Sequence, residues 1–125
     1  MSVAPSTREL AHPLCDEIRL ESVLHALSDP LRLRVVRDLA LAEQELTCSH
    51  FGLPITKSTL THHFRVLRES GVIRQIYRGT AKMNGLRRAD LDALFPGLLD
   101  GVLGAAAAQE ARLGRTRMRR QGAVR

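Results

Sequence analysis

A helix with two unlike faces is encoded by residues 57–71, KSTLTHHFRVLRESG. At about 100° per residue, Leu60, Phe64 and Leu67 fall at about 300°, 340° and 280° from Lys57. They form one apolar stripe, which predicts a face packed on a core. The opposite arc, from about 0° to 140°, is made of hydroxyls, an imidazole and cations. Its members are Lys57, Ser58, Thr61, His62, Arg65 and Arg68.

This polar arc favours contact with DNA over simple solvation, because Ser, Thr and His stand where a solvated face normally carries Glu/Lys pairs. Donors and cations suit phosphates and base edges, and the major groove admits a helix. Thr56 lies at the helix N-terminus, which attracts anions, and Arg65 is a cation; both are expected to contact the phosphate backbone of DNA. His63, at about 240°, is expected to be a hydrogen-bonded core residue. Recognition helices read bases with their N-terminal residues. The expected base contacts are Lys57, Ser58, Thr61 and His62.

Start and stop signals predict more elements on the N-terminal side. Asp29 can cap a helix that begins at Pro30, and Thr47 can cap a short third helix that ends near residues 51–52. Thr56 caps the helix of residues 57–70, and Gly71 provides its left-handed stop. A helical spacing also precedes residue 28. Its members are Leu20, Val23, Leu24 and Leu27.

Beyond Gly71 the pattern predicts a hairpin and then a helical end. Residues 72–77 and 81–84 are the hairpin strands, and residues 78–80 are the turn. Arg78 and Lys82 are expected to reach the DNA backbone. Apolar residues between Leu91 and Leu103 keep one helical phase across Pro96-Gly97, which predicts one kinked helix or two in register. The expected fold is mainly α with a small β-hairpin, in the winged helix-turn-helix order α-α-α-α-β-β-α.

The charge is segregated along the chain. The net charge is +6, but residues 57–88 carry +7 and residues 112–125 carry +6, while residues 1–56 and 89–111 carry −3 and −4. A basic block inside a folded domain is typical of a protein that binds a polyanion.

The composition of the 125 residues excludes several classes. No apolar run approaches the roughly 20 residues that span a membrane, and the N-terminus lacks a secretory pattern. Two cysteines are too few for a disulfide scaffold. We therefore expect a cytoplasmic protein. Catalysis is not expected, because the sequence has no phosphate loop, no nucleophile motif and no paired carboxylates in an apolar setting.

Three regions are expected: a flexible arm at residues 1–15, the folded domain at 16–113 and an Arg-rich, disordered tail at 114–125. A chain of this size leaves little core to cover the last apolar stripe, which favours a subunit interface. The expected interface residues, on the dimer-forming terminal helices, are Leu20, Leu24, Leu98, Leu99, Val102 and Leu103. The tail is expected either to touch DNA or to remain solvated.

Two motifs, LHALSDPLR at residues 24–32 and KSTLTHHFRVLRESGVI at residues 57–73, closely resemble the ArsR/SmtB family of bacterial winged-helix repressors. The resemblance spans roughly residues 17–104. It implies a homodimer built by the first and last helices, bound to a pseudo-palindromic operator on double-stranded DNA. It also implies release by an inducer, which the sequence does not identify.

The metal motifs of that family are not matched. Thr47 and Ser49 occupy the positions of its two thiolate ligands, Cys48 is out of frame, and no His follows residue 63. No cofactor is therefore expected. A separate site remains as an alternative, because four N/S ligands suit zinc. Its candidate ligands are His12, Cys15, Cys48 and His50.

Two alternative functions stay open at this point. Cys15 and Cys48 could make the protein a metal- or redox-sensing regulator. The second alternative function is that of a small basic RNA-binding protein. Against it, Tyr77 is the only Tyr and Trp is absent, so the sequence offers few aromatic side chains on which single-stranded bases can stack.

Overall fold

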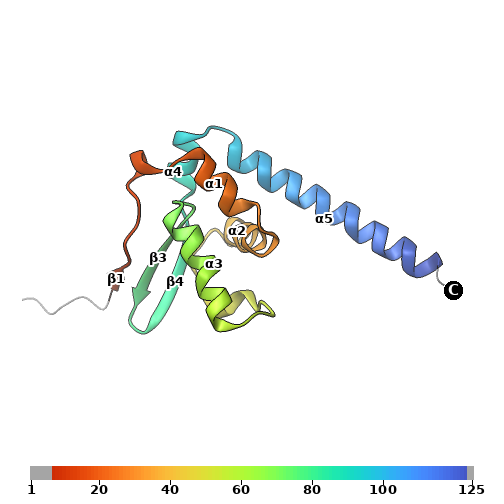
Figure 1. The fold of residues 1–125 in the computed structure, drawn as a ribbon, viewed down its shortest axis with the longest axis horizontal. Helices are drawn as coiled ribbons and strands as arrows, with labels where there is room; N and C mark the ends of the chain where they lie inside the picture. Colours follow the sequence, from red (N-terminus) through yellow and green to blue (C-terminus); the bar gives the residue numbers. More distant parts are fainter. Residues whose placement is uncertain (1–6, 124–125) are drawn as a thin grey trace, which may run out of the picture.

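The computed structural model describes residues 7–123, whose elements follow the predicted winged helix-turn-helix order (Figure 1). The α-helices are α1 Leu20–Leu27, α2 Pro30–Ala42, α3 Lys57–Glu69, α4 Arg88–Leu94 and α5 Leu98–Ala123. Two 3-10 helices are η1 Cys15–Glu17 and η2 Cys48–Phe51. The strands are β1 Thr7–Glu9, β2 Leu46–Thr47, β3 Ile73–Arg78 and β4 Ala81–Leu86. The mainly α fold with a hairpin is thus confirmed, with the third helix reduced to η2.

The helix boundaries follow from their caps. Asp29 accepts hydrogen bonds from the backbone N–H groups of Leu31 and Arg32 at 2.9 and 3.1 Å, so α2 begins at Pro30 as predicted. Thr56 accepts from the N–H of Thr59 at 3.3 Å and starts α3. After α3, Gly71 has a φ of +86° and turns the chain into β3.

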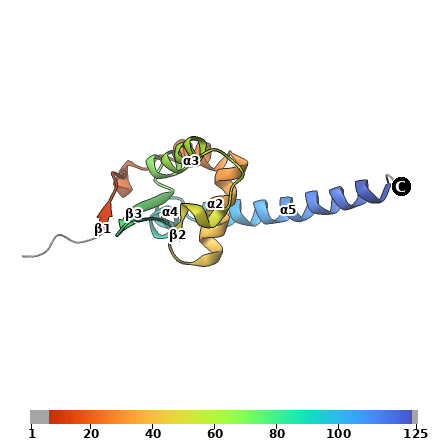
Figure 2. The ribbon, with the colours of Figure 1, turned by 90° about the horizontal axis from the view of Figure 1, so that it is seen from below.

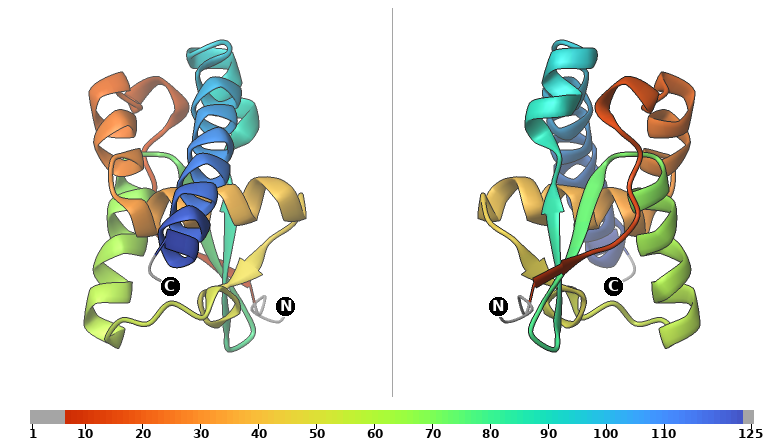
Figure 3. Two further views of the ribbon diagram at one scale, coloured as in Figure 1. Left: turned by 90° about the vertical axis from the view of Figure 1, so that its right-hand side faces the viewer. Right: turned by 90° about the vertical axis from the view of Figure 1, so that its left-hand side faces the viewer.

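The core lies where α1, α2 and α3 meet the inner face of the hairpin (Figure 3). Its largest side chains are at most 2% exposed, and they include Val35, Leu39, Phe64, Leu67 and Ile73. All of these are aliphatic except Phe64, in line with the low aromatic content of the chain. Burial of this face fixes α3 against the body and leaves its polar face outward.

The N-terminal segment corrects one expectation. Residues 1–15 were expected to form a flexible arm, but β1 pairs antiparallel with β3, with Thr7 opposite Arg78 and Glu9 opposite Ile76. With β2 on the other edge, the hairpin becomes the centre of a four-stranded sheet of order β1-β3-β4-β2. Residues 1–6 of the expected arm lie outside the described residues.

The C-terminal helices correct two further expectations from the sequence. α4 and α5 are bent by 110° at the Pro96-Gly97 break, so the apolar residues from Leu91 to Leu103 do not form one continuous stripe. Beyond residue 113, where disorder was expected, α5 continues to Ala123 and projects from the body (Figure 1). No single helix within residues 7–123 is long and apolar enough to cross a membrane.

The expected subunit interface is divided between the surface and the core. Leu20 and Leu24 on α1 are 43% and 45% exposed, whereas Leu99 is only 2% exposed and belongs to the core of its own chain. The 110° bend explains this difference, because it turns the start of α5 back onto the body. The half-buried residues that pack partly on this core are Leu98, Val102 and Leu103.

Candidate nucleic-acid interface

The polar face of α3 is open to solvent. Its predicted contact residues are all exposed: Thr56, Lys57, Ser58, Thr61, His62 and Arg65. On the opposite face, Phe64 is 2% exposed and Leu67 is fully buried. Arg68 differs from the predicted arc, because its guanidinium turns back and donates to Oε1 of Gln75 at 2.6 Å. The helix therefore offers hydroxyls, one imidazole and two cations to an approaching partner.

The first turn of α3 is held by its own hydroxyls. Thr56 Oγ1 accepts from the N–H of Thr59 at 3.3 Å and donates to Oγ1 of the same residue at 2.9 Å. One turn later, Thr61 Oγ1 donates to the carbonyl of Lys57 at 2.9 Å. These bonds fix the end of the helix at which recognition helices present residues to bases.

A buried polar cluster locks α3 to α2. Arg32 is 6% exposed and donates to the carbonyls of Ala26 and His25 at 2.8 and 3.2 Å. It also donates to Nδ1 of His63 at 3.0 Å, which leaves the ring proton of a neutral His63 on Nε2. His63 is 9% exposed, so its predicted place as a hydrogen-bonded core residue is confirmed.

Asp29 completes this cluster, 4.0 Å from Nδ1 of His63. Burial opposes its ionisation, but the N–H groups of Arg32 and Leu31 donate to the carboxylate, and the pKa of Asp29 lies below its ordinary value. The SDP segment at residues 28–30 thus serves as a helix cap and as part of the α2–α3 contact.

The hairpin turn lies at the same end of the molecule as the first turn of α3, the lower end in Figures 1 and 3. Figure 2 looks onto this end from below. Gly79 makes the turn with a φ of +66°, and Lys82 lies 5.9 Å from the centre of the Tyr77 ring. One surface can therefore engage both the helix and the wing.

The predicted backbone contact Arg78 is occupied within the chain. Its Nε and Nη2 donate to the two carboxylate oxygens of Glu45 at 2.6 and 3.0 Å. The hydrogen bond from Arg78 holds the pKa of Glu45 below its ordinary value. Since the Arg78 side chain is 51% exposed, a phosphate can exchange with Glu45 at little cost.

A second polar chain, which the sequence did not predict, runs beneath the wing. Gln75 and Asn84 are fully buried, and the Gln75 amide donates to Asn84 Oδ1 at 2.8 Å. Asn84 Nδ2 donates to the carbonyl of Leu46 at 3.1 Å and lies 3.3 Å from Cys48 Sγ. With the bond from Arg68 to Gln75, the chain links α3, the hairpin and η2. The available sequence signal was a polar residue at an inward strand position.

The four candidate metal ligands have separate surroundings; His50 is exposed, and its ring meets the Phe51 ring edge-on with 5.7 Å between the ring centres. His12 Nε2 accepts from the backbone N–H of Gln75 at 2.8 Å, and Cys48 contacts Asn84. Partial burial and the carboxylate of Asp90 raise the pKa of the Cys15 thiol, which lowers its thiolate fraction. Cys15 and Cys48 are free thiols. In residues 7–123, no three His, Cys, Asp or Glu residues are grouped to hold a metal ion.

Comparison with known proteins identifies the domain type. A helix-turn-helix domain model matches residues 27–76, which run from the end of α1 into β3. An uncharacterized HTH-type transcriptional regulator of Bacillus subtilis (strain 168), YceK, is 34% identical over 87 residues. The match covers 68% of this chain and 86% of that protein.

A solved structure shares the fold. An ArsR family transcriptional regulator has a TM-score of 0.51 at 22% identity, covering 77% of this chain and 96% of its own. The transcriptional repressor BigR from Xylella fastidiosa has a TM-score of 0.48 at 27% identity, covering 61% of this chain and 85% of its own.

Proposed function

Because the chain belongs to the HTH-type transcriptional regulators, we propose that it is a homodimeric repressor of ArsR type that binds a pseudo-palindromic DNA operator in the cytoplasm. A chemical signal controls its release. The single observation that carries this proposal is the composition and exposure of the α3 face, next to a wing at the same end of the domain.

The roles of the side chains follow from position. The residues proposed to read base edges in the major groove are Lys57, Ser58, Thr61 and His62. Thr56 and Arg65 bind phosphates beside α3, and Arg78 and Lys82 bind phosphates from the wing. Two copies place their α3 helices in successive major grooves, about 34 Å apart along the duplex.

Base reading can be separated from general attraction to phosphate by one double variant. Lys57→Ala with His62→Ala is expected to weaken specific binding by about 1–3 kcal/mol per lost base contact. Binding to an unrelated duplex should change less, because base contacts add little to non-specific affinity. Fluorescence anisotropy with an operator selected from random duplexes measures both affinities.

Glu69→Ala is the matched control, since Glu69 is exposed at the opposite end of the same helix. It should retain the wild-type preference for the operator. Equal affinity of the double variant and the wild type for the operator would show that the α3 face does not read bases.

A further inference from the structure

A cavity of about 970 Å³ lies on the side of the domain away from the α3 face, beneath the N-terminal segment of residues 9–15. Its other walls are the end of α2, the end of β4 and the start of α4. Leu10, Leu39 and Leu86 supply apolar lining. This volume lies in the range of pockets that hold small organic molecules.

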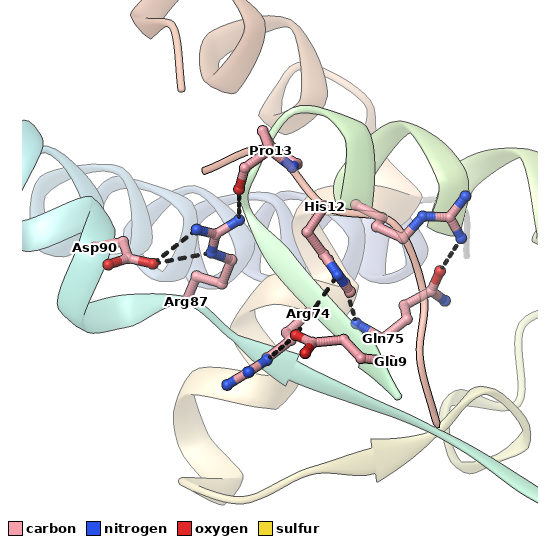
Figure 4. A network of polar contacts seen from close by, with 8 residues as sticks. Glu9, His12, Pro13, Arg74, Gln75, Arg87 and Asp90 are labelled. Atoms are coloured by element: carbon pink, nitrogen blue, oxygen red, sulfur yellow. Dashed lines mark hydrogen bonds and ion pairs between the residues drawn. The ribbon is translucent and has the colours of Figure 1, made fainter. Parts of the chain in front are cut away.

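The N-terminal segment is fastened over this cavity by bonds to the body (Figure 4). Arg87 donates to the carbonyl of Pro13 at 2.8 Å, and Arg74 donates to Glu9 at 2.6 Å. His12 accepts from the N–H of Gln75 at 2.8 Å. Arg74 and Gln75 belong to β3, so the wall of the cavity is attached to the wing.

The charges of the lining favour a cation over an anion. Each lining arginine already has a carboxylate: Arg74 has Glu9 at 2.6 Å, Arg87 has Asp90 at 2.9 Å, and Arg88 has Asp100 at 3.0 Å. An anionic ligand would have to break one of these pairs, whereas a cation can reach Glu43, which has no ion pair among residues 7–123, and compete only with the half-exposed Arg78 at Glu45. The lining also contains Glu43 and Glu45, at the end of α2.

Glu43 occupies a position that is unfavourable for stability. It is the C-cap of α2 with a φ of +53°, the one non-glycine residue with a positive φ among residues 7–123. A carboxylate there also meets the negative end of the helix dipole. Within the same residues, no Lys, Arg or His forms an ion pair with Glu43. A ligand cation at this end of the cavity would offset the repulsion between the Glu43 carboxylate and the helix dipole, and it would give that carboxylate an ion-pair partner.

We propose that the cavity binds a small organic amine with an apolar body, and that its ammonium group replaces Arg78 at Glu45. The inference deepens the proposed function and depends on it, because Arg78 is one of the proposed phosphate contacts; the signal for release is then the loss of the amine. Arg78 cannot hold Glu45 and a phosphate with the same donors. Once DNA takes Arg78, the Glu45 carboxylate is left for the ammonium group. Amine and DNA therefore favour each other's binding, and the coupling is reciprocal.

Binding is tested with three molecules of one shape: biphenylmethylamine, biphenylmethanol and biphenylacetate. Isothermal titration of the DNA-free protein should show the amine bound at least about tenfold more tightly than the alcohol or the acid. Neither of these molecules can make the charge-assisted hydrogen bond from an ammonium group to Glu45, and the loss of that bond lowers the affinity by at least this factor. Equal affinity for the three molecules would overturn the proposal, because it would mean general attraction to apolar surface.

The site is located with two tryptophan variants on α4. Ala89 is exposed and lines the cavity, whereas Ala93 is exposed one turn later and does not line it. Ala89→Trp should take up part of the cavity beside α4 and weaken amine binding at least about tenfold, and Ala93→Trp should bind as the wild type does. Amine binding that survives Ala89→Trp would place the amine elsewhere and overturn the assignment.

The coupling is tested with DNA. Saturating biphenylmethylamine should tighten operator binding about two- to fivefold per subunit, the range expected for one exposed ion pair. Glu45→Gln should bind DNA more tightly without amine and should lose the amine effect, because Arg78 then has no carboxylate to leave. Weaker DNA binding with amine, or a full amine effect in Glu45→Gln, would overturn the mechanism.

The two proposals fail in different ways. The Lys57→Ala, His62→Ala variant should lose operator affinity and still bind the amine as tightly as the wild type. If the wild type binds the amine but no duplex DNA, the proposed function is wrong and the cavity remains a ligand site. If it binds DNA but not the amine, only the inference about the cavity is wrong.

Discussion

Arg32 is the side chain that makes the position of α3 specific. A buried guanidinium is costly unless every donor finds an acceptor, and here the acceptors come from α1 and α3. The chain therefore tolerates a cation at 6% exposure only when α1, α2 and α3 are all in place. This makes Arg32 a sensitive reporter of the packing behind α3.

Removal of Arg32 should be costly. Arg32→Ala leaves His63 Nδ1 and the Ala26 carbonyl without the Arg32 donors, while the His25 carbonyl keeps Ser28, so the free energy of unfolding is expected to fall by about 3 kcal/mol. Arg34→Ala, on the exposed side of the same helix, should change it by less than about 0.5 kcal/mol. Urea denaturation of the two variants measures both. Equal losses would show that the buried cluster contributes no more than a surface cation.

His12 should give the stability a pH dependence whose sign follows from its surroundings. Burial lowers the pKa of His12 from its ordinary value of 6.5, and Arg87 and Arg68 act in the same direction, against Glu9. Between the folded and unfolded pKa values the unfolded chain binds more protons, so this residue's contribution is complete above pH 6.5 and is lost as the pH falls below it.

The free energy of unfolding should accordingly decrease between about pH 7.5 and about pH 5.5, where carboxylates stay ionised. In His12→Gln the same interval should be flatter, because no imidazole titrates. Denaturation at each pH measures both slopes. A variant as steep as the wild type would assign the dependence to another group.

Gly71 joins α3 to β3, the first strand of the wing. Its φ of +86° turns the chain, and an added Cβ would lie 2.5 Å from Cγ1 of Ile18. Backbone strain and a clash with the segment before α1 therefore coincide at this residue. Gly79, in the hairpin turn, has a φ of +66° with nothing within 4 Å of an added Cβ.

The two glycines separate strain from packing. Gly71→Ala should lower the free energy of unfolding by about 2–4 kcal/mol, the sum of a left-handed alanine and an overpacked contact. Gly79→Ala should lower it by about 1 kcal/mol, from strain alone. Thermal or urea unfolding compares them, and equal losses would show that Ile18 moves away without cost.

The helices that sequence reasoning placed correctly are those with local signals. Asp29, Thr56 and Gly71 act within four residues of themselves, so their effect can be predicted without the rest of the chain. The two faces of α3 follow from helical spacing alone, and the buried Phe64 and Leu67 confirm them. The exposure of the polar α3 face was predictable for the same reason.

The elements that were missed depend on distant partners. β1 has only three residues, and its strand pairing is with β3, more than 60 residues away. The bond between Arg78 and Glu45 likewise joins segments whose proximity is set by the hairpin fold. The 110° bend at Pro96-Gly97 could not be distinguished from a kink, because both conserve the apolar spacing.

At the scale of the whole molecule, charge and apolar surface are separated. The basic block of residues 57–88 lies on α3, the hairpin and the start of α4, while α1 carries exposed Leu20 and Leu24. α5 projects from the body near this apolar surface (Figure 1). A partner that covers α1 and α5 would leave the α3 face open, as a dimer on DNA requires.

The proposed dimer should be broken by substitutions on α1 that leave α3 unchanged. Leu20→Glu with Leu24→Glu places four carboxylates in an interface of two copies, and each lost leucine contact is worth about 1.5–3 kcal/mol. The dimer dissociation constant should rise at least about 100-fold.

Leu41→Glu is the control, because Leu41 is 79% exposed at the end of α2. Sedimentation equilibrium should find Leu41→Glu dimeric and the double variant monomeric, and operator affinity should fall with the dimer because one copy reads one half-site. A double variant that stays dimeric would move the interface away from α1.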